Sequence, residues 1–378
     1  MVHDGFSDVT YVLLPLLAQT FGLSLSQVGL IRSAHRVAMA SFQLPAGLLA
    51  ERCGARNLLA IGTFIAGIAF IALGYAPGFL AILVTLFFAG VGSAVQHPLS
   101  STLISHAYPA EGRRTALGTY NFSGDVGKFA FGGIVSLCVL AGIAWQAPVV
   151  VFGFAGIAAG VMVLLTTSDV RTRAQRPDAD RPGARGWGIR HKPAFAALCA
   201  LDAVDSFTRT GFLTFVAFLL IARGLPEGWA ALAVPFILVG SMAGKYACGV
   251  LAERLGVLRT IVVTEIATGA GILLTLALPP VATFFLLPLI GVVLQGTSSV
   301  IYGTIGDLVE QERLPRAFGV VYTTGACCGI VAPLAYGLLG DAIGIEMTIA
   351  VIGAVVVLGL PLCLVLRPSL RLSGSASA

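Results

Sequence analysis

Charged residues are scarce in this chain of 378 residues, and their scarcity excludes a soluble surface. Asp, Glu, Lys and Arg together make up 11% of the sequence and hydrophobic residues 57%, whereas a soluble domain carries about 25% charged residues. The mean hydropathy is +0.93. This is the composition of an integral membrane protein.

Motifs of soluble enzymes are also missing. The sequence has no Walker lysine loop, no His-Glu-x-x-His and no Gly-x-Ser-x-Gly, so it gives no sign of ATP hydrolysis or other catalysis. Its seven cysteines include no Cys-x-x-Cys pair, and we interpret them as small buried hydrophobic residues rather than disulfides or metal ligands. We therefore expect no enzyme activity, no cofactor and no bound metal.

The chain has instead many apolar runs that can cross a bilayer, which takes about 20 residues each. Backbone polar groups inside lipid must be satisfied within their own segment, so runs of this length are helices, whereas barrel strands would be about 10 residues long and alternate strictly. We expect an all-α membrane protein with twelve transmembrane helices. The expected spans are 2–21, 27–50, 57–75, 78–105, 115–141, 146–167, 193–222, 228–252, 258–278, 282–308, 316–340 and 346–366.

An internal repeat divides these spans into two halves. The octapeptide from Gly47 to Gly54 returns, with two substitutions, from Gly249 to Gly256, 202 residues later. A second match, Ala-Leu-Gly at 116–118 and Ala-Phe-Gly at 317–319, follows at nearly the same offset. Two separate matches indicate a duplicated six-helix bundle, as many transporters have.

The longest polar segment, 168–192, contains seven basic residues and separates the spans six and six. We expect an N-terminal half at 1–167, a cytoplasmic linker at 168–192, a C-terminal half at 193–366 and a cytoplasmic tail at 367–378. Span one has no basic leader and no cleavage pattern, so we expect it to stay as an uncleaved helix.

Basic residues are distributed unevenly between the two sides of the expected bundle. With the N-terminus inside, 17 of the 23 basic residues fall in inner loops and tail, and the outer loops hold only Arg223. The positive-inside rule then places both termini in the cytoplasm, in a bacterial inner (plasma) membrane. The net charge of +5 therefore reflects the orientation of the chain in the membrane. We expect no nucleic-acid partner.

The repeated octapeptide, Gly-x-Leu-Ala-Glu-Arg-x-Gly, resembles the loop signature of the major facilitator superfamily. The resemblance covers nearly the whole chain and implies a monomeric transporter that works by alternating access. Where this sequence has Glu51 and Glu253, the family usually has Asp. The residues that the resemblance assigns to a conformational loop motif are Gly47, Glu51, Arg52, Gly54, Gly249, Glu253, Arg254 and Gly256.

A narrower resemblance is to the fosmidomycin-resistance group of that superfamily. It rests on His97-Pro98 followed by Ser100-Ser101, and on Asp4 eleven residues before Pro15. It implies efflux by proton antiport. The group has Glu where Leu99 stands, so its drug substrate is not carried over. More apolar residues precede the Asp in that group, and we expect that the given start removes part of the first helix.

Ionisable residues inside the spans are the candidates for function, because a charge at bilayer depth costs about 2.5–3.5 kcal/mol on insertion scales. Asp125 with Lys128, and Asp205 with Arg209, stand one helical turn apart, so they either neutralise each other as structural pairs or serve transport. The residues of this kind are Asp4, Asp8, Arg32, Arg36, Asp125, Lys128, Asp202, Asp205, Arg209, Lys245 and Glu265.

Two groups of residues follow from these positions. Span nine commonly lies toward lipid in the superfamily, so Glu265 is left out of both. Expected to bind the solute are Arg36, His97, Lys128, Arg209, Tyr120 and Asn121. Expected to couple protons are Asp4, Asp8, Asp125 and Asp205.

We predict a secondary active transporter for a small anionic or zwitterionic organic solute or drug, working by proton-coupled efflux, with the solute, protons and the lipid bilayer as partners. An uptake symporter or facilitator for an organic anion would use the same basic residues. A non-transporting receptor or scaffold with this fold is a third possibility.

Overall fold

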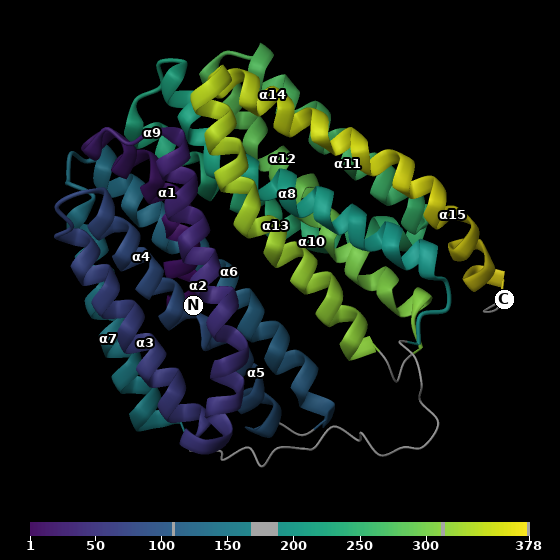
Figure 1. Ribbon diagram of the computed structural model, residues 1–378, viewed down its shortest axis with the longest axis horizontal. Coiled ribbons are helices and arrows are strands. Elements are labelled where there is room, and N and C mark those ends of the chain that lie inside the picture. Colours follow the sequence, from purple (N-terminus) through teal and green to yellow (C-terminus); the bar gives the residue numbers. More distant parts are fainter. Residues whose placement is uncertain (108–109, 168–187, 311–313, 376–378) are drawn as a thin grey trace. The chain divides into compact units, whose positions relative to one another are not determined.

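The computed structural model describes residues 1–107, 110–167, 188–310 and 314–375, and helices occupy almost all of them (Figure 1). The chain forms two compact units, of which the first comprises Met1–Asp180 and Pro226–Pro235 and the second Arg181–Leu225 and Phe236–Ala378. The short segment Pro226–Pro235, at the start of the eighth span, thus groups with the first unit.

Unit 1 contains the first six spans. Its helices are α1 (Val2–Phe21), α2 (Leu25–Cys53), α3 (Ala55–Gly74), α4 (Phe79–Ala94), α5 (Gln96–Ala107), α6 (Ala110–Leu140), α7 (Gln146–Thr166) and the short α9 (Glu227–Ala231). The fourth span is divided into α4 and α5 at Val95, three residues before Pro98. Proline has no backbone N–H, so it fits the first turn of α5, where that group would have no partner within the helix.

Unit 2 contains the remaining spans. Its helices are α8 (Lys192–Ala222), α10 (Ala233–Leu255), α11 (Val257–Ala277), α12 (Pro280–Leu308), α13 (Leu314–Ile343), α14 (Ile345–Val355), a 3-10 turn (Val356–Leu358) and α15 (Gly359–Ser375). The helix α15 continues to Ser375, so the segment expected to be a tail after residue 366 is helical over most of its length.

Ten of these segments are long and apolar enough to cross a membrane. The two spans outside that group are α1 and α2, which carry the charged residues Asp4, Asp8, Arg32 and Arg36. The helices follow the twelve expected spans in order, and their ends differ from the expected ones by a few residues. The prediction of an all-α bundle of twelve transmembrane helices is confirmed.

The duplication is visible in the backbone. Three pairs of glycines with positive φ stand 202 residues apart, at 22 and 224, 54 and 256, and 142 and 344. Side chains strain a backbone in this left-handed region, and glycine does not. The first pair also repeats a hydrogen bond, Leu23 N to Ala18 O (2.9 Å) and Leu225 N to Leu220 O (3.0 Å). The two halves therefore share one register.

A helix crossing also repeats, with a shift of 201 residues for its glycine and 202 for the carbonyl that the glycine contacts. A β-carbon on Gly90 of α4 would collide with the carbonyl oxygen of His35 on α2, and one on Gly291 of α12 with that of Ile237 on α10. Small residues let membrane helices approach to main-chain contact, where van der Waals packing holds them together.

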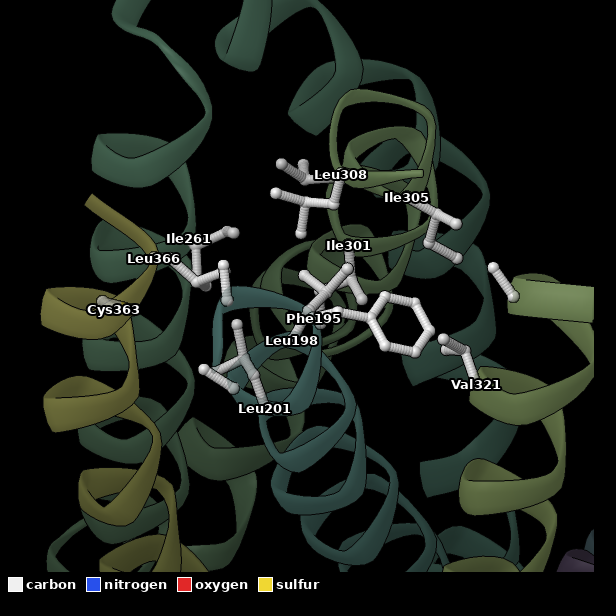
Figure 2. Close-up of a cluster of buried hydrophobic side chains, with 14 of the residues drawn as sticks. Phe195, Leu198, Leu201, Ile261, Ile301, Ile305, Leu308, Val321, Cys363 and Leu366 are labelled. Carbon is white, nitrogen blue, oxygen red and sulfur yellow. The ribbon is translucent and has the colours of Figure 1, made fainter. Parts of the chain in front are cut away.

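A cluster of apolar side chains fills one end of unit 2 (Figure 2). Phe195, Leu198 and Leu201 project from α8 toward Ile301 and Ile305 of α12, and all five are buried. Dispersion contacts supply the stability here, since lipid tails are as apolar as leucine. At the same end, Arg190 N donates to Leu308 O and Glu310 N donates to Gly188 O, both at 3.0 Å.

Candidate functional site

The most connected acid of unit 1 is Asp4 on α1. The side chain of Gln96, the first residue of α5, donates from Nε2 to Asp4 Oδ2 at 2.6 Å and lies 2.9 Å from the hydroxyl of Tyr120 on α6. His97 Nε2 is 3.7 Å from Asp4 Oδ1. Gly124 of α6 makes room for this carboxylate, because a β-carbon there would lie 2.8 Å from Oδ2. The interruption at Val95 thus starts a helix whose first two side chains reach α1.

A lysine joins α6 to α1 beside this acid. Lys128 Nζ lies 3.2 Å from Asp125 Oδ1, one turn earlier on α6, and 4.0 Å from Asp8 Oδ2 on α1. The expected pair within α6 is therefore present, and the same ammonium group also faces a second acid. A lysine between two carboxylates can exchange one partner for the other, or for an anionic ligand.

Two arginines of α2, Arg32 and Arg36, lie against α1 through Tyr11. Arg32 is fully buried, its Nη1 donates to the carbonyl oxygen of Ser7 at 3.0 Å, and its guanidinium carbon lies 3.6 Å from the centre of the Tyr11 ring. Arg36 Nη2 donates to the Tyr11 hydroxyl at 3.4 Å. A cation over an aromatic face is stabilised by the ring quadrupole.

Tyr11 is not among the residues that the sequence singled out, which were mainly charged. A signal was available, because Asp4, Asp8 and Tyr11 stand at i, i+4 and i+7 and so share one face of α1.

These contacts belong to one cluster of charges. His97 interacts electrostatically with Asp4, Lys128, Asp8 and Arg36. Its side chain is 46% exposed and that of Lys128 26%, whereas Asp4 is 7% exposed. We call this group, comprising Asp4, Asp8, Arg36, His97, Asp125 and Lys128, the charged site of unit 1. His97 and Lys128 are thus more exposed than Asp4, the most buried acid of the site. In this arrangement an anion could approach the bases while a proton reaches the acid.

Two further expected residues lie in unit 2. On α8, Arg209 Nη1 is 3.5 Å from Asp205 Oδ2, and its Nη2 donates to Ser206 Oγ at 3.1 Å. This is the expected pair one turn apart within the helix. Glu265 of α11 is 2% exposed, so the expectation of a place toward lipid does not fit this side chain.

The repeated loops lie at the junctions α2–α3 and α10–α11, where Gly54 (φ 83°) and Gly256 (φ 88°) end one helix and begin the next. Glu253 and Arg254 are exposed. The side chains of Glu51, Arg52 and Asn121, and position Gly47, lie outside the described part of the structure, so their predicted roles stay predictions.

A groove of about 870 Å³ lies between α11 and α15. Apolar side chains such as Val262, Leu360 and Leu364 line most of it, with Arg259 and Arg367 at its border. None of the residues expected to bind solute or protons lines it, so it is separate from the charged site of unit 1.

Comparison with known proteins gives consistent matches. A model of the Major Facilitator Superfamily matches residues 1–245 and residues 204–377. The chain is 26% identical over 389 residues to SauU of Cupriavidus necator, a probable sulfoacetate transporter, with 94% of this chain and 88% of the relative covered. It is 24% identical over 368 residues to the hexuronate transporter of Bacillus subtilis, with 87% and 83% covered.

A solved structure has the same fold. The bacterial homologue of the human lysosomal transporter Spinster superposes with a TM-score of 0.81 at 16% identity, covering 98% of this chain and 96% of that one. These relatives are transporters and not enzymes. The matches are to the superfamily as a whole, and the narrower resemblance to the fosmidomycin-resistance group stays a prediction.

Proposed function

Since the chain belongs to the major facilitator superfamily and is an integral membrane transporter of small solutes, we propose that its solute is a small organic anion bound at the charged site of unit 1. Arg36, His97 and Lys128 would hold the carboxylate or sulfonate group. Asp4 would carry the coupling proton.

The observation that supports this proposal is the arrangement of basic and acidic side chains in unit 1. Three basic side chains gather around acids, and His97 and Lys128 are more exposed than the acids that they face. Each uncompensated charge at membrane depth is costly, so bases that give up an acidic partner need another anion in its place. The relatives named for sulfoacetate and hexuronate transport make organic anions the solute class to test first.

Proton coupling follows from competition for these bases. When Asp4 or Asp8 takes up a proton, it stops competing with the solute for His97 or Lys128. Binding of the proton and of the anion are then linked, and each favours the other.

This linkage favours movement of the proton and the anion in the same direction, as cotransport into the cell. Efflux by exchange against protons, which the narrower resemblance implies, would use the same residues. The sign of the proton movement that accompanies solute entry distinguishes the two.

The experiment is solute flux in proteoliposomes with an imposed pH gradient, using a panel of carboxylates, sulfonates and phosphonates, while a pH dye inside the vesicles records proton movement. We expect an anion of this panel to move with protons. Arg36→Ala should weaken solute binding at least tenfold, which corresponds to about 1.4 kcal/mol. Arg190→Ala, which removes an exposed charge at the end of the linker, is the matched control and should transport normally. Movement of neutral or cationic solutes alone would contradict the proposal.

A further inference from the structure

A shift of 202 residues matches helices α1–α3 of unit 1 to α8, α10 and α11 of unit 2, and at one pair of contacting positions the counterparts in unit 2 are two acids. In unit 1, His3 Nε2 of α1 and Thr63 Oγ1 of α3 lie 2.7 Å apart, and both residues are buried. Adding 202 to these positions gives Asp205 of α8 and Glu265 of α11. Where unit 1 has a neutral hydrogen bond between two helices, unit 2 therefore has two carboxyl groups at the corresponding positions.

The register is supported on both helices near these positions. On α3 and α11, Gly67 and Gly269 stand four residues after Thr63 and Glu265. A β-carbon on Gly67 would lie 2.7 Å from the carbonyl oxygen of Gly153, and one on Gly269 would lie 3.1 Å from that of Gly353. On α1 and α8, the helices end at the matching left-handed glycines 22 and 224. Between these glycines and the two acids, the helices of unit 2 have no insertion or deletion relative to those of unit 1.

The surroundings of Glu265 agree with this correspondence. Asp205 is 4% exposed and Glu265 2%, and Glu265 interacts electrostatically with Asp205 and Arg209. Gly359, the first residue of α15, lies near both helices: a β-carbon there would be 3.0 Å from the Leu201 side chain of α8 and 3.9 Å from Glu265 Oε2. Within the described ranges, Glu265 Oε1 and Asp205 Oδ2 have no hydrogen-bond donor.

The protonation state of Asp205 and Glu265 can be inferred from the balance of charges around them. Arg209 is the cation that interacts with both acids among the described side chains. Two ionised carboxylates beside one guanidinium would leave a net negative charge in the membrane interior, which is costly. Two buried acids that interact in a medium of low dielectric constant do not both ionise. One proton held between them makes the group of three residues neutral.

We propose that Asp205 and Glu265 share one proton, as a hydrogen-bonded carboxyl–carboxylate pair, and form a proton-binding site within unit 2. This site lies in the other half of the chain from Asp4 and does not depend on the nature of the solute. Glu265, which the usual position of span nine in the superfamily placed toward lipid, becomes the second partner of the proton.

Other titratable groups face this pair from neighbouring helices. Asp202 of α8 interacts with Asp205 and with Tyr302 of α12, and Cys363 of α15 faces Glu265. Tyr336 of α13 packs against Gly211, six residues after Asp205 on α8. Of these, Asp202 could also bind a proton, so the test must separate its signal from that of the pair.

Infrared difference spectroscopy of the purified protein in detergent tests the proposal, because a protonated carboxyl absorbs apart from carboxylates and amides. Spectra of D205N and of E265Q, each subtracted from the parent at neutral pH, should show the same lost carboxylic-acid band. E253Q, which removes an exposed acid, should lose none. D202N should keep the band, which separates the pair from its neighbour.

A second variant guards against misfolding. D205H/E265T copies the His3–Thr63 pair of unit 1 into unit 2, so it should fold, restore a neutral hydrogen bond and lack the band. Two outcomes would overturn the proposal: the absence of any such band in the parent at neutral and mildly acidic pH, or a band that disappears when sodium is added at constant pH. The second outcome would mean that the acids bind a metal cation instead.

Discussion

Gln96 donates a 2.6 Å hydrogen bond to the carboxylate of Asp4, and the same amide nitrogen lies 2.9 Å from the hydroxyl of Tyr120. One side chain at the start of α5 thus joins α1 and α6. Because it lies directly after the interruption at Val95, movement of α5 relative to α4 would change the donor available to Asp4. The hydrogen bonding of this acid is therefore connected to the geometry of the fourth span.

Replacing Gln96 tests that connection. Gln96→Leu keeps the volume but leaves the buried Asp4 oxygen without its donor, which costs about 1–3 kcal/mol. We expect a lower midpoint of thermal unfolding in detergent and a lower transport rate. Tyr120→Phe removes only the second contact and should have the smaller effect. If Gln96→Leu and the parent are equally stable, this hydrogen bond contributes nothing to the free energy of unfolding.

The coupling acids can be separated from the solute-binding bases by their effects on uphill transport. An acid that exchanges a proton must change charge during the cycle, and an amide cannot. Asp4→Asn and Asp125→Asn should each abolish pH-driven accumulation while leaving some downhill exchange. Measuring accumulation and exchange of one solute in proteoliposomes checks both parts. If both variants concentrate the solute as the parent does, these acids are structural partners of His97 and Lys128.

The repeated loop motif should act on the conformational cycle. Glu51→Gln and Arg52→Ala remove charges at a helix junction outside the charged site, where acids and arginines can pair in one state and separate in the other. We expect slower turnover with an unchanged dissociation constant for the solute. Glu253→Gln, at the repeated position, should behave in the same way. Weaker solute binding with normal turnover would count against this role.

Arg223, at the end of α8, connects three helices of unit 2. It donates to the carbonyl oxygens of Thr275 (2.8 Å) and Leu278 (3.2 Å) and pairs with Glu346 at 2.9 Å. Arg223→Ala should cost about 1.5–3 kcal/mol, the usual value of hydrogen bonds to a charged group. Glu346→Gln should cost less than about 1 kcal/mol, since that side chain is 58% exposed. Thermal unfolding of both variants tests the difference.

The orientation in the membrane is tested by labelling single cysteines with an impermeant thiol reagent. Gly183→Cys, in the linker, should react only after the cells are opened, and Glu227→Cys should react in intact cells, because the basic residues concentrate on the linker side. A variant without native cysteines provides the background. Labelling of Gly183→Cys from outside would reverse the predicted topology.

The sequence predicted the spans closely because their limits are set by length and by local signals. The junctions at Gly54 and Gly256 follow from a repeated motif, and most helix ends fall within three residues of expectation. The division of the fourth span at Val95 was not predicted, although Pro98 marked its place. Hydropathy averages over such an interruption, since both sides of it are apolar.

The partners of the buried charges were harder to predict. Pairs within a helix, such as Asp205 with Arg209, follow from spacing alone. The contact of Arg32 with the Ser7 carbonyl and the burial of Glu265 depend on how each helix is rotated against its neighbours. A chain that is apolar on nearly all faces gives little periodicity from which that rotation could be deduced.

The crossing of Gly90 over the carbonyl of His35, repeated as Gly291 over the carbonyl of Ile237, has a consequence for how such a chain diverges after gene duplication. The contact is made by main-chain atoms, so the side chain at the crossed position is free to differ, and one copy has histidine where the other has isoleucine. The glycines therefore preserve the close helix crossing in both copies. Each copy can therefore acquire its own set of ionisable groups by single substitutions, without a compensating change in helix spacing.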